Sequence, residues 1–311
     1  MNTLTKEAKV DVLIPTYKPG NMFGNIIKRL IKQTVDINRI IVINTEEAYW
    51  DHEYEDLTDK LEVHHISKAD FGHGSSRNAL ASYSDADVIV YLTQDAKPFN
   101  QFLIERLIAP LSKDDKVFCS YGRQLARGDA IEIEKFTRAY NYPHSSSVKS
   151  AADLERYGIK TYFCSNSCAA YLREEFENLG GFDTECNFGE DTILAAEIIK
   201  AGGNIAYCAD AIVYHSHNYT IMQQFRRNFD IGVMHADFLS RYDVPKAESE
   251  GMKLVIKTAC YLVEIREYLW ISYLWISSAA KYAGYLLGKN HKLLPKHIKM
   301  KLAMNPDYFK K

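Results

Sequence analysis

Three short segments of the chain carry acidic side chains or imidazoles in positions suited to phosphate and sugar chemistry. The residues are Asp95, the pair Glu190 and Asp191, and the pair His215 and His217. Carboxylate oxygens and imidazole nitrogens bind divalent cations such as Mn²⁺, and a carboxylate can also take a proton from an attacking hydroxyl group. These residue types indicate a site that handles an anionic ligand through a metal ion.

Asp95 follows the apolar run 88–92, which has the composition of a buried strand. In an open parallel sheet, ligands collect beyond the carboxyl ends of the strands, so Asp95 lies at the correct end. The motif Asp85-Ala86-Asp87 lies at the opposite end, on the order of 15 Å away at about 3.3 Å per residue. We interpret that motif as lying outside the site. The alternative for Asp95 is an Asx turn before Lys97 and Pro98.

Two further predicted strands, 10–15 and 40–44, also end in polar groups. Parallel strands bring their carboxyl ends to one edge of a sheet, so we expect these groups to share a crevice with Asp95. The residues concerned are Pro15, Thr16, Tyr17, Asn44, Thr45 and Glu46, with Thr93 and Gln94 after the strand 88–92.

Cationic side chains occur in two helix-like segments. In the segment 68–80, Gly72 and Gly74 permit close approach of the backbone, and Arg77 is expected to open a helix. A guanidinium group beside a polar crevice suits an anion. Arg226 and Arg227 are further candidates for a diphosphate. The alternative for each arginine is a solvated charge on a helix surface.

The segment 190–201 has the apolar spacing of a helix and ends at a pair of glycines. Glu190 and Asp191 lie at its start, where acids commonly cap a helix. A helix start also favours an ionised carboxylate, as a general base requires. Of His215 and His217, we expect at most one to face the crevice, and we favour His215 because it directly follows the strand.

Strand-like and helix-like segments alternate along the first part of the chain. Strands are predicted at 10–15, 40–44, 88–92 and 117–122, with one or two more in 205–215, and helices at 24–34 and in the segment that contains 77–83. This alternation indicates an α/β fold with a mainly parallel sheet flanked by helices. The polar segment 140–160 is predicted to be a loop and a candidate mobile flap. We expect a catalytic domain at 1–245 and a helical region at 246–311.

Composition and hydropathy argue against several classes of protein. The chain has 311 residues and a formal net charge of −2, which argues against a nucleic-acid binder. The sequence shows no secretory signal and no apolar stretch of the length needed for a membrane span. The six cysteines form no CxxC pair and are expected to be reduced thiols in a cytoplasmic protein.

The C-terminal region combines aromatic residues with lysines. Residues 261–288 include Trp270 and Trp275, and the stretch from 281 onward holds eight lysines and one acid, Asp307. One interpretation is a helical pair that packs on the catalytic domain or on a second copy of the chain. The other is peripheral contact with anionic lipid at the inner face of the cell membrane.

Taken together, these segments resemble family 2 glycosyltransferases with the A-type fold, over roughly residues 9–235. The similar motifs are VDVLIPTY, TQDA, GGFDTECNFGEDTILAAEI and YHSH. The resemblance implies a single α/β domain that binds a sugar nucleotide. Within the family, YGRQ, NYP, FGHGSSRN and FDIGVMH resemble the bacterial rhamnosyltransferase branch, whose members use dTDP-L-rhamnose to build cell-surface polysaccharide.

The resemblance also implies site roles. In an inverting, single-displacement reaction, Asp191 would be the base with Glu190 beside it, and Asp95 with His215 would bind Mg or Mn. The implied donor-binding residues are Pro15, Thr16, Tyr17, Asn44, Glu46, Arg77, Gln94 and Arg226. The implied acceptor-binding residues are Arg123, Gln124 and Asn187, towards a saccharide that is expected to be lipid-linked.

Two alternatives remain open at this point. Where the family often has a pair of acids after the second strand, this chain has Asn44 and Thr45 with Glu46 one place later. The donor could therefore be a UDP-hexose. A second alternative is a non-catalytic subunit that binds a sugar nucleotide as a scaffold. The acid pair at 190–191 favours an enzyme, because a scaffold has no need of a base.

Overall fold

The computed structural model describes residues 8–242 and 248–310. The chain forms two compact units, which are considered separately. The first comprises residues up to Leu125, Tyr142–Thr184 and Glu190–His215, and the second comprises Ala126–Asn141, Glu185–Gly189 and Ser216 onward. The expected domain boundary near residue 245 stays a prediction.

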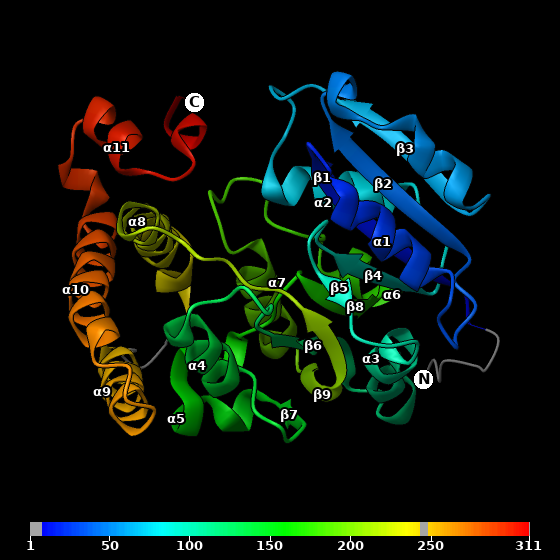
Figure 1. The fold of residues 1–311 in the computed structure, drawn as a ribbon. Helices are drawn as coiled ribbons and strands as arrows, with labels where there is room; N and C mark the ends of the chain where they lie inside the picture. Colours follow the sequence, from blue (N-terminus) through cyan, green and yellow to red (C-terminus); the bar gives the residue numbers. More distant parts are fainter. Residues whose placement is uncertain (1–7, 243–247, 311) are drawn as a thin grey trace. The chain divides into compact units, whose positions relative to one another are not determined.

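A nine-stranded sheet forms the centre of the first unit (Figure 1). The strand order is β3-β2-β1-β4-β8-β6-β9-β5, and β7 pairs with β9. The strands are β1 Val10–Tyr17, β2 Arg39–Thr45, β3 Leu61–Ile66, β4 Val88–Leu92, β5 Lys97–Pro98, β6 Val117–Leu125, β7 Ser147–Lys149, β8 Cys168–Leu172 and β9 Asn204–Tyr214.

Most of these strands run in one direction. Strands β1 to β4 pair in parallel, while β8 is antiparallel to both β4 and β6. Strand β6 therefore runs with β4, and β9 is parallel to β6. The carboxyl ends of β1, β2, β4, β6 and β9 consequently lie at the same edge of the sheet. This arrangement confirms the predicted α/β fold.

Helices cover both faces of this sheet. Helices α1 (Asn21–Leu30) and α3 (Leu103–Lys113) pack on one face, where their apolar side chains join the main core with Val12, Ile14 and Val90. The opposite face is packed by α2 (His73–Ser82), α6 (Arg173–Asn178) and α7 (Glu190–Lys200). An aromatic cluster of Tyr91, Tyr171, Phe176 and Phe182 lies there.

The structure confirms the predicted strands and the helix at 190–201, and it corrects two predictions. Residues 140–160 are not simply a polar loop, because β7 pairs with β9, and α5 (Leu154–Tyr157) and short 3₁₀ turns follow. The Lys149 ammonium is buried there and donates to the carbonyls of Lys160 and Phe163. The helix predicted at 77–83 begins earlier, at His73, so Arg77 does not open it.

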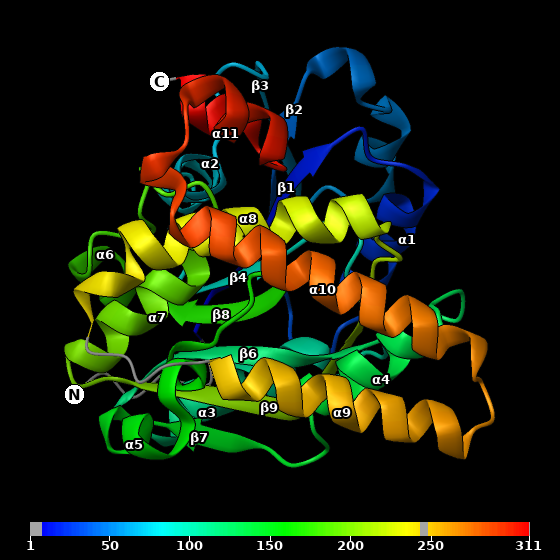
Figure 2. The same cartoon turned by 90° about the vertical axis from the view of Figure 1, so that its left-hand side faces the viewer.

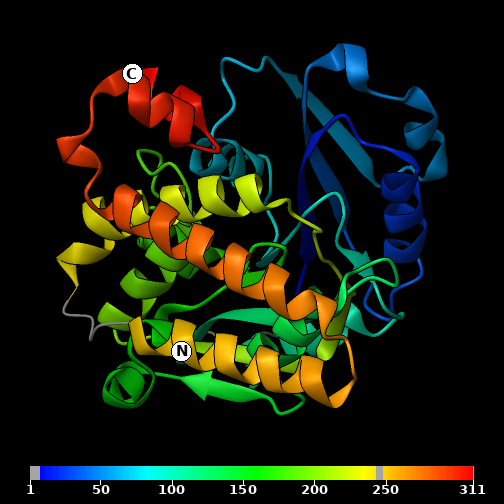
Figure 3. The same ribbon diagram turned by 60° about the vertical axis from the view of Figure 1, so that its left-hand side comes forward.

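The second unit is mainly helical (Figures 2 and 3). Its helices are α4 (Glu132–Asn141), α8 (Ile221–Asp237), α9 (Glu248–Glu264), α10 (Leu269–Lys289) and α11 (Lys296–Leu302). Helix α10 lies along α8, and α9 packs beside α4 and α10. Among the described residues, no helix has both the length and the apolar character needed to cross a membrane.

Candidate active site

The candidate site lies at the carboxyl edge of the sheet in the first unit. Thr16 and Asn44 lie one residue before the ends of β1 and β2, and the Thr16 hydroxyl lies 3.1 Å from Asn44 Oδ1. Asp95 follows β4, and His215 follows β9. The short strand β5 pairs with the end of β9, so the two segments that carry Asp95 and His215 run beside one another.

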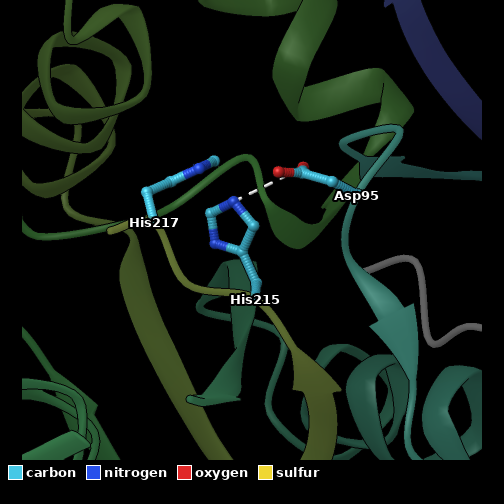
Figure 4. Close-up of side chains that lie close together, drawn as sticks. All are labelled: Asp95, His215 and His217. Atoms are coloured by element: carbon cyan, nitrogen blue, oxygen red, sulfur yellow. Dashed lines mark ion pairs between the residues drawn. The ribbon is translucent and has the colours of Figure 1, made fainter. Parts of the chain in front are cut away.

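Asp95 and His215 form a close pair. The His215 Nε2 atom lies 3.5 Å from Asp95 Oδ1 (Figure 4). On the other side of the ring, Nδ1 lies 2.8 Å from Gln124 Oε1, and Gln124 Nε2 donates to the Ser165 hydroxyl at 2.9 Å. An amide oxygen only accepts, so this contact places the imidazole proton on Nδ1. The lone pair of Nε2 is thereby directed towards Asp95, as a metal ligand requires.

His217 contributes to the same cluster, which corrects a prediction. Asp95, His215 and His217 each offer a ligand atom, and these atoms lie within 4.8 Å of one another. The expectation that only one imidazole would face the site is wrong, because alternate residues of an extended chain share a face. A carboxylate oxygen and two imidazole nitrogens fit a divalent cation of the Mn²⁺ type.

The motif Asp85-Ala86-Asp87 lies outside the site, as its position predicted. The Asp85 carboxylate pairs with Arg39 at 2.6 Å, and Asp87 accepts from the backbone N–H of Lys9 at 2.8 Å. Both acids lie before β4, at the amino end of the parallel strands. They hold the start of the sheet and do not belong to the site.

Glu190 is held by an ion pair inside the first unit. The Arg77 guanidinium lies 3.0 Å from Glu190 Oε1, and both side chains are buried. Burial opposes the charge on Glu190, but Arg77 and His73 outweigh it, so the pKa of this carboxyl is lowered. Arg77 is therefore engaged with an acid, and its expected contact with a donor diphosphate stays a prediction.

Asp191, the next residue, has the opposite electrostatic environment. Its carboxylate accepts from the backbone N–H of Asn166 at 3.1 Å and of Thr192 at 2.8 Å. Burial and the charge of Glu190 together raise its pKa to about 6. The expectation that the helix start would keep this pKa low is thus corrected. Neighbouring acids with divergent pKa values are typical of a division between a structural and a reacting carboxylate.

Asn166 is a site residue that the sequence did not reveal. Its backbone N–H donates to Asp191, its Nδ2 donates to Glu190 Oε1 at 3.2 Å, and its Oδ1 accepts from the Tyr171 hydroxyl at 2.8 Å. One buried residue thus fixes both acids, Asp191 through its backbone and Glu190 through its side chain. It lies in the segment Ser165-Asn166-Ser167, which has no periodic pattern and offered no signal.

The residues expected to bind the donor base lie around the ends of β1 and β2. The Gln94 side chain bonds both the N–H and the carbonyl of Tyr17, which links the ends of β1 and β4. The Tyr17 ring is exposed and meets Tyr49 edge-on, with the Lys18 ammonium 4.2 Å from the Tyr49 centroid. Exposed aromatic rings beside a cation suit a nucleotide.

Asn44 and Glu46 are both engaged in local structure. Asn44 Nδ2 lies 3.1 Å from both the Glu46 carbonyl and His65 Nδ1, and the Glu46 carboxylate accepts from the Lys68 N–H. Pro15 is partly buried within β1. The structure therefore gathers these expected donor-binding residues in one region, and their contacts with a donor stay predictions.

Gly74 permits a close approach of the backbone, as the sequence predicted. A Cβ atom at Gly74 would lie 2.1 Å from the carbonyl oxygen of Asp183. The glycine thus allows α2 to approach the backbone of the segment before α7. This close contact also brings α2, with Arg77, against the segment that carries Glu190.

The expected acceptor-binding residues are distributed over both units. Arg123 Nη2 lies 3.0 Å from His144 Nε2 in the first unit, and Gln124 is the buried partner of His215. Asn187 lies in the second unit, where its Nδ2 donates to the Asp230 carbonyl at 3.3 Å. Their roles towards an acceptor stay predictions.

The two arginines of α8 differ in their surroundings. Arg226 is exposed, while the Arg227 guanidinium lies 4.6 Å from the Phe188 ring and 5.7 Å from the Tyr219 ring. The aromatic contacts hold Arg227 in place. The expected contact of Arg226 with a diphosphate is not tested by these contacts.

Comparison with known proteins identifies the family. The model of glycosyl transferase family 2 matches residues 11–180. The O-antigen chain rhamnosyltransferase RfbN of Salmonella typhimurium is 38% identical over 304 residues, which cover 97% of this chain and 96% of that protein. This chain belongs to glycosyl transferase family 2. The O-antigen chain rhamnosyltransferase WbaN of Salmonella anatum is also 38% identical, over 96% of this chain and 95% of that protein.

Solved structures of glycosyltransferases share the fold. The mannosyltransferase PcManGT from Pyrobaculum calidifontis, determined with GDP-Man and Mn²⁺, superposes with a TM-score of 0.58 at 16% identity, covering 98% of this chain and 86% of that one. Residues 1–349 of S. aureus TarS give a TM-score of 0.51 at 15% identity, with 91% of each chain covered. These likenesses confirm that the family 2 member has the A-type glycosyltransferase fold.

Proposed function

We propose that this family 2 glycosyltransferase transfers L-rhamnose from dTDP-L-rhamnose to a saccharide acceptor during synthesis of a bacterial cell-surface polysaccharide. The observation that carries the proposal is the 38% identity to two O-antigen chain rhamnosyltransferases over nearly the whole of each chain. The similarity extends through the C-terminal helices, beyond the part matched by the family model. A lipid-linked saccharide is the acceptor we favour.

Asp191 is the proposed base. Its raised pKa of about 6 makes it a stronger base than an ordinary aspartate, yet it is mostly ionised at pH 7. As the acceptor oxygen bonds to the anomeric carbon, its proton passes to Asp191 and the bond from that carbon to the phosphate oxygen breaks. The electron pair leaves with dTDP, and the configuration at the anomeric carbon inverts.

Glu190 supports this base without reacting. Its carboxylate is occupied by Arg77 and by Asn166 Nδ2. Its charge, beside the burial of Asp191, keeps the pKa of that base high. The backbone N–H groups of Asn166 and Thr192 hold the Asp191 carboxylate in a fixed orientation for the acceptor hydroxyl.

Asp95, His215 and His217 are the proposed metal ligands. A bound Mg²⁺ or Mn²⁺ would neutralise the charge that develops on the leaving diphosphate. Gln124 holds His215 in the tautomer that presents Nε2, and Asp95 supplies the hard oxygen ligand. The diphosphate and water would complete the coordination, which implies weak metal binding in the absence of donor.

The proposed activity is tested with purified full-length chain and a panel of donors, each with and without Mn²⁺. Release of nucleoside diphosphate from dTDP-rhamnose, dependent on the metal and lost in Asp191→Asn, is the expected result. Turnover of UDP-glucose or UDP-galactose in place of dTDP-rhamnose would overturn the donor and keep the mechanism. Tight binding of a sugar nucleotide with no turnover on any acceptor would support the scaffold alternative.

A further inference from the structure

Helix α9 exposes an apolar stripe. Met252, Ile256 and Val263 are each at least half exposed, and Cys260 is exposed between them. These residues are separated by four, four and three positions, which places them on one face of a helix. The buried residues Thr258 and Leu262 lie on the opposite side.

Helix α10 also exposes an apolar face. Leu269 is 91% exposed, Trp275 is 51% exposed and Ile276 is 58% exposed, and Tyr282 and Leu287 continue the same face. The other side of α10 is already packed: a Cβ atom at Gly284 or Gly288 would lie within 2.3 Å of a carbonyl oxygen of α8. Helix α10 thus has apolar side chains on both sides. This pattern is typical of a helix whose outer side is also covered, by a partner or by lipid.

Helices α9 and α10 are neighbours in the second unit, and each exposes apolar side chains. The two helices contact one another, and both lie at the front of that unit in Figure 2. We call the set Met252, Ile256, Val263, Leu269, Trp275, Ile276, Tyr282 and Leu287 the outer apolar face. Several large apolar side chains exposed on two neighbouring helices mark an interaction site.

The net charge of the C-terminal region favours an anionic partner for the outer apolar face. Residues 248–311 hold eleven Lys and Arg against five Asp and Glu, a net charge of +6 in a chain whose overall charge is −2. Lys289, Lys292, Lys296 and Lys301 are exposed at the end of α10 and beyond it. A second copy of the chain would bring the same positive charge to this surface and be repelled, whereas an anionic lipid surface would attract it.

We propose that the outer apolar face binds the surface of an anionic membrane, with α9 and α10 lying in the interface plane. Trp275 and Tyr282 have the amphipathic rings that favour the headgroup region. The lysines beyond α10 contact lipid phosphates, and the apolar side chains enter the acyl boundary. This binding does not depend on which sugar the enzyme transfers, and it would bring the active chain to a lipid-linked acceptor.

The test is sedimentation of the full-length chain with vesicles of phosphatidylcholine alone or with about one third phosphatidylglycerol. The chain is expected to sediment with the anionic vesicles and to remain in the supernatant with the neutral ones. Trp275→Glu with Ile276→Glu is expected to reduce the bound fraction about tenfold or more, and Lys296→Glu with Lys301→Glu similarly. Ile31→Glu, an exposed apolar residue of the first unit, is the matched control and should bind as wild type.

Circular dichroism melting and nucleoside diphosphate release establish that each variant is folded and active. The proposal is overturned if wild type stays in the supernatant with anionic vesicles, or if the outer-face variants bind as well as Ile31→Glu. It is also overturned if light scattering shows a dimer that Trp275→Glu dissociates while vesicle binding is absent. The vesicles contain no sugar donor, so failure here is distinct from failure of the proposed transfer reaction.

Discussion

The Arg77 guanidinium lies 3.0 Å from Glu190 in a buried ion pair, and the residue after Glu190 is the proposed base. Removing one partner of a buried pair leaves an unpaired charge, which costs about 3 to 5 kcal/mol. The pair therefore fixes the start of α7 and also sets the electrostatic environment of Asp191.

The first prediction concerns the pH dependence of transfer. Asp191 must be ionised to accept a proton, and its pKa is raised to about 6. The value of kcat/KM is therefore expected to be constant near pH 8 and to fall tenfold per unit below about pH 6. Asp191→Asn is expected to lower kcat by about 10²- to 10⁴-fold. Initial rates across pH 4.5 to 8.5 measure this dependence. A fall of kcat/KM that begins only near pH 4 would contradict the assignment of Asp191 as the base.

The second prediction uses Arg77 and Glu190 as a matched pair. The charge of Glu190 raises the pKa of Asp191, while that of Arg77 lowers it. Glu190→Gln should therefore lower the pH at which kcat/KM begins to fall to a value below 6, and Arg77→Met should raise it above 6. Each variant should unfold at lower urea concentration, and the double variant should lose less stability than the sum. Shifts in the same direction would argue against electrostatic control by this pair.

The third prediction concerns the support of the metal site. Gln124→Leu removes the acceptor that places the proton on His215 Nδ1. Residues that hydrogen-bond to a metal ligand in this way change metal affinity by about 10- to 100-fold. The Mn²⁺ concentration for half-maximal activity should rise by that factor, with little change in kcat at saturating Mn²⁺. A substitution at the neighbouring residue, Arg123→Lys, is the control. If both changes raise the Mn²⁺ concentration for half-maximal activity equally, Gln124 has no specific role at the metal site.

The fourth prediction concerns a buried carboxylate in α8. Asp230 Oδ2 accepts from the backbone N–H groups of Met304 and Asn305, which ties the C-terminal segment to the helix. Asp230→Ala should lower the free energy of unfolding by about 3 kcal/mol. Asp230→Asn keeps an accepting oxygen and should lose less than about 1 kcal/mol at pH 7. Urea denaturation measures both free energies of unfolding. Equal losses in the two variants would show that the hydrogen bonds from Met304 and Asn305 do not account for the stabilisation by Asp230.

Burial also gives Asp230 a pH-dependent effect on stability. Its pKa is raised to about 6, above the ordinary value of an unfolded aspartate. Between those values the folded chain retains a proton that the unfolded chain has lost, so this contribution to the free energy of unfolding declines as pH rises to about 6 and is lost above it. Asp230→Asn has no such proton, so the difference in stability between wild type and this variant should change with pH over that interval.

Local patterns in the sequence were sufficient to locate the main strands, the helix at 190–201 and the position of Asp95. Apolar runs specify buried strands, and parallel strands place their carboxyl ends together, so Asp95 and His215 were expected at one edge. The same logic separated Asp95 from Asp85 and Asp87, whose ion pair and hydrogen bond in the structure indicate a structural role.

Only the tertiary structure decided how the site groups are paired and charged. Arg77 meets Glu190, and Asn166 bridges two acids from far along the chain, and neither contact has a local sequence signal. Burial raised the pKa of Asp191 where its helix position alone suggested a low value. Periodicity encodes which face of an element is buried, whereas partners and desolvation arise from contacts between segments that are distant in sequence.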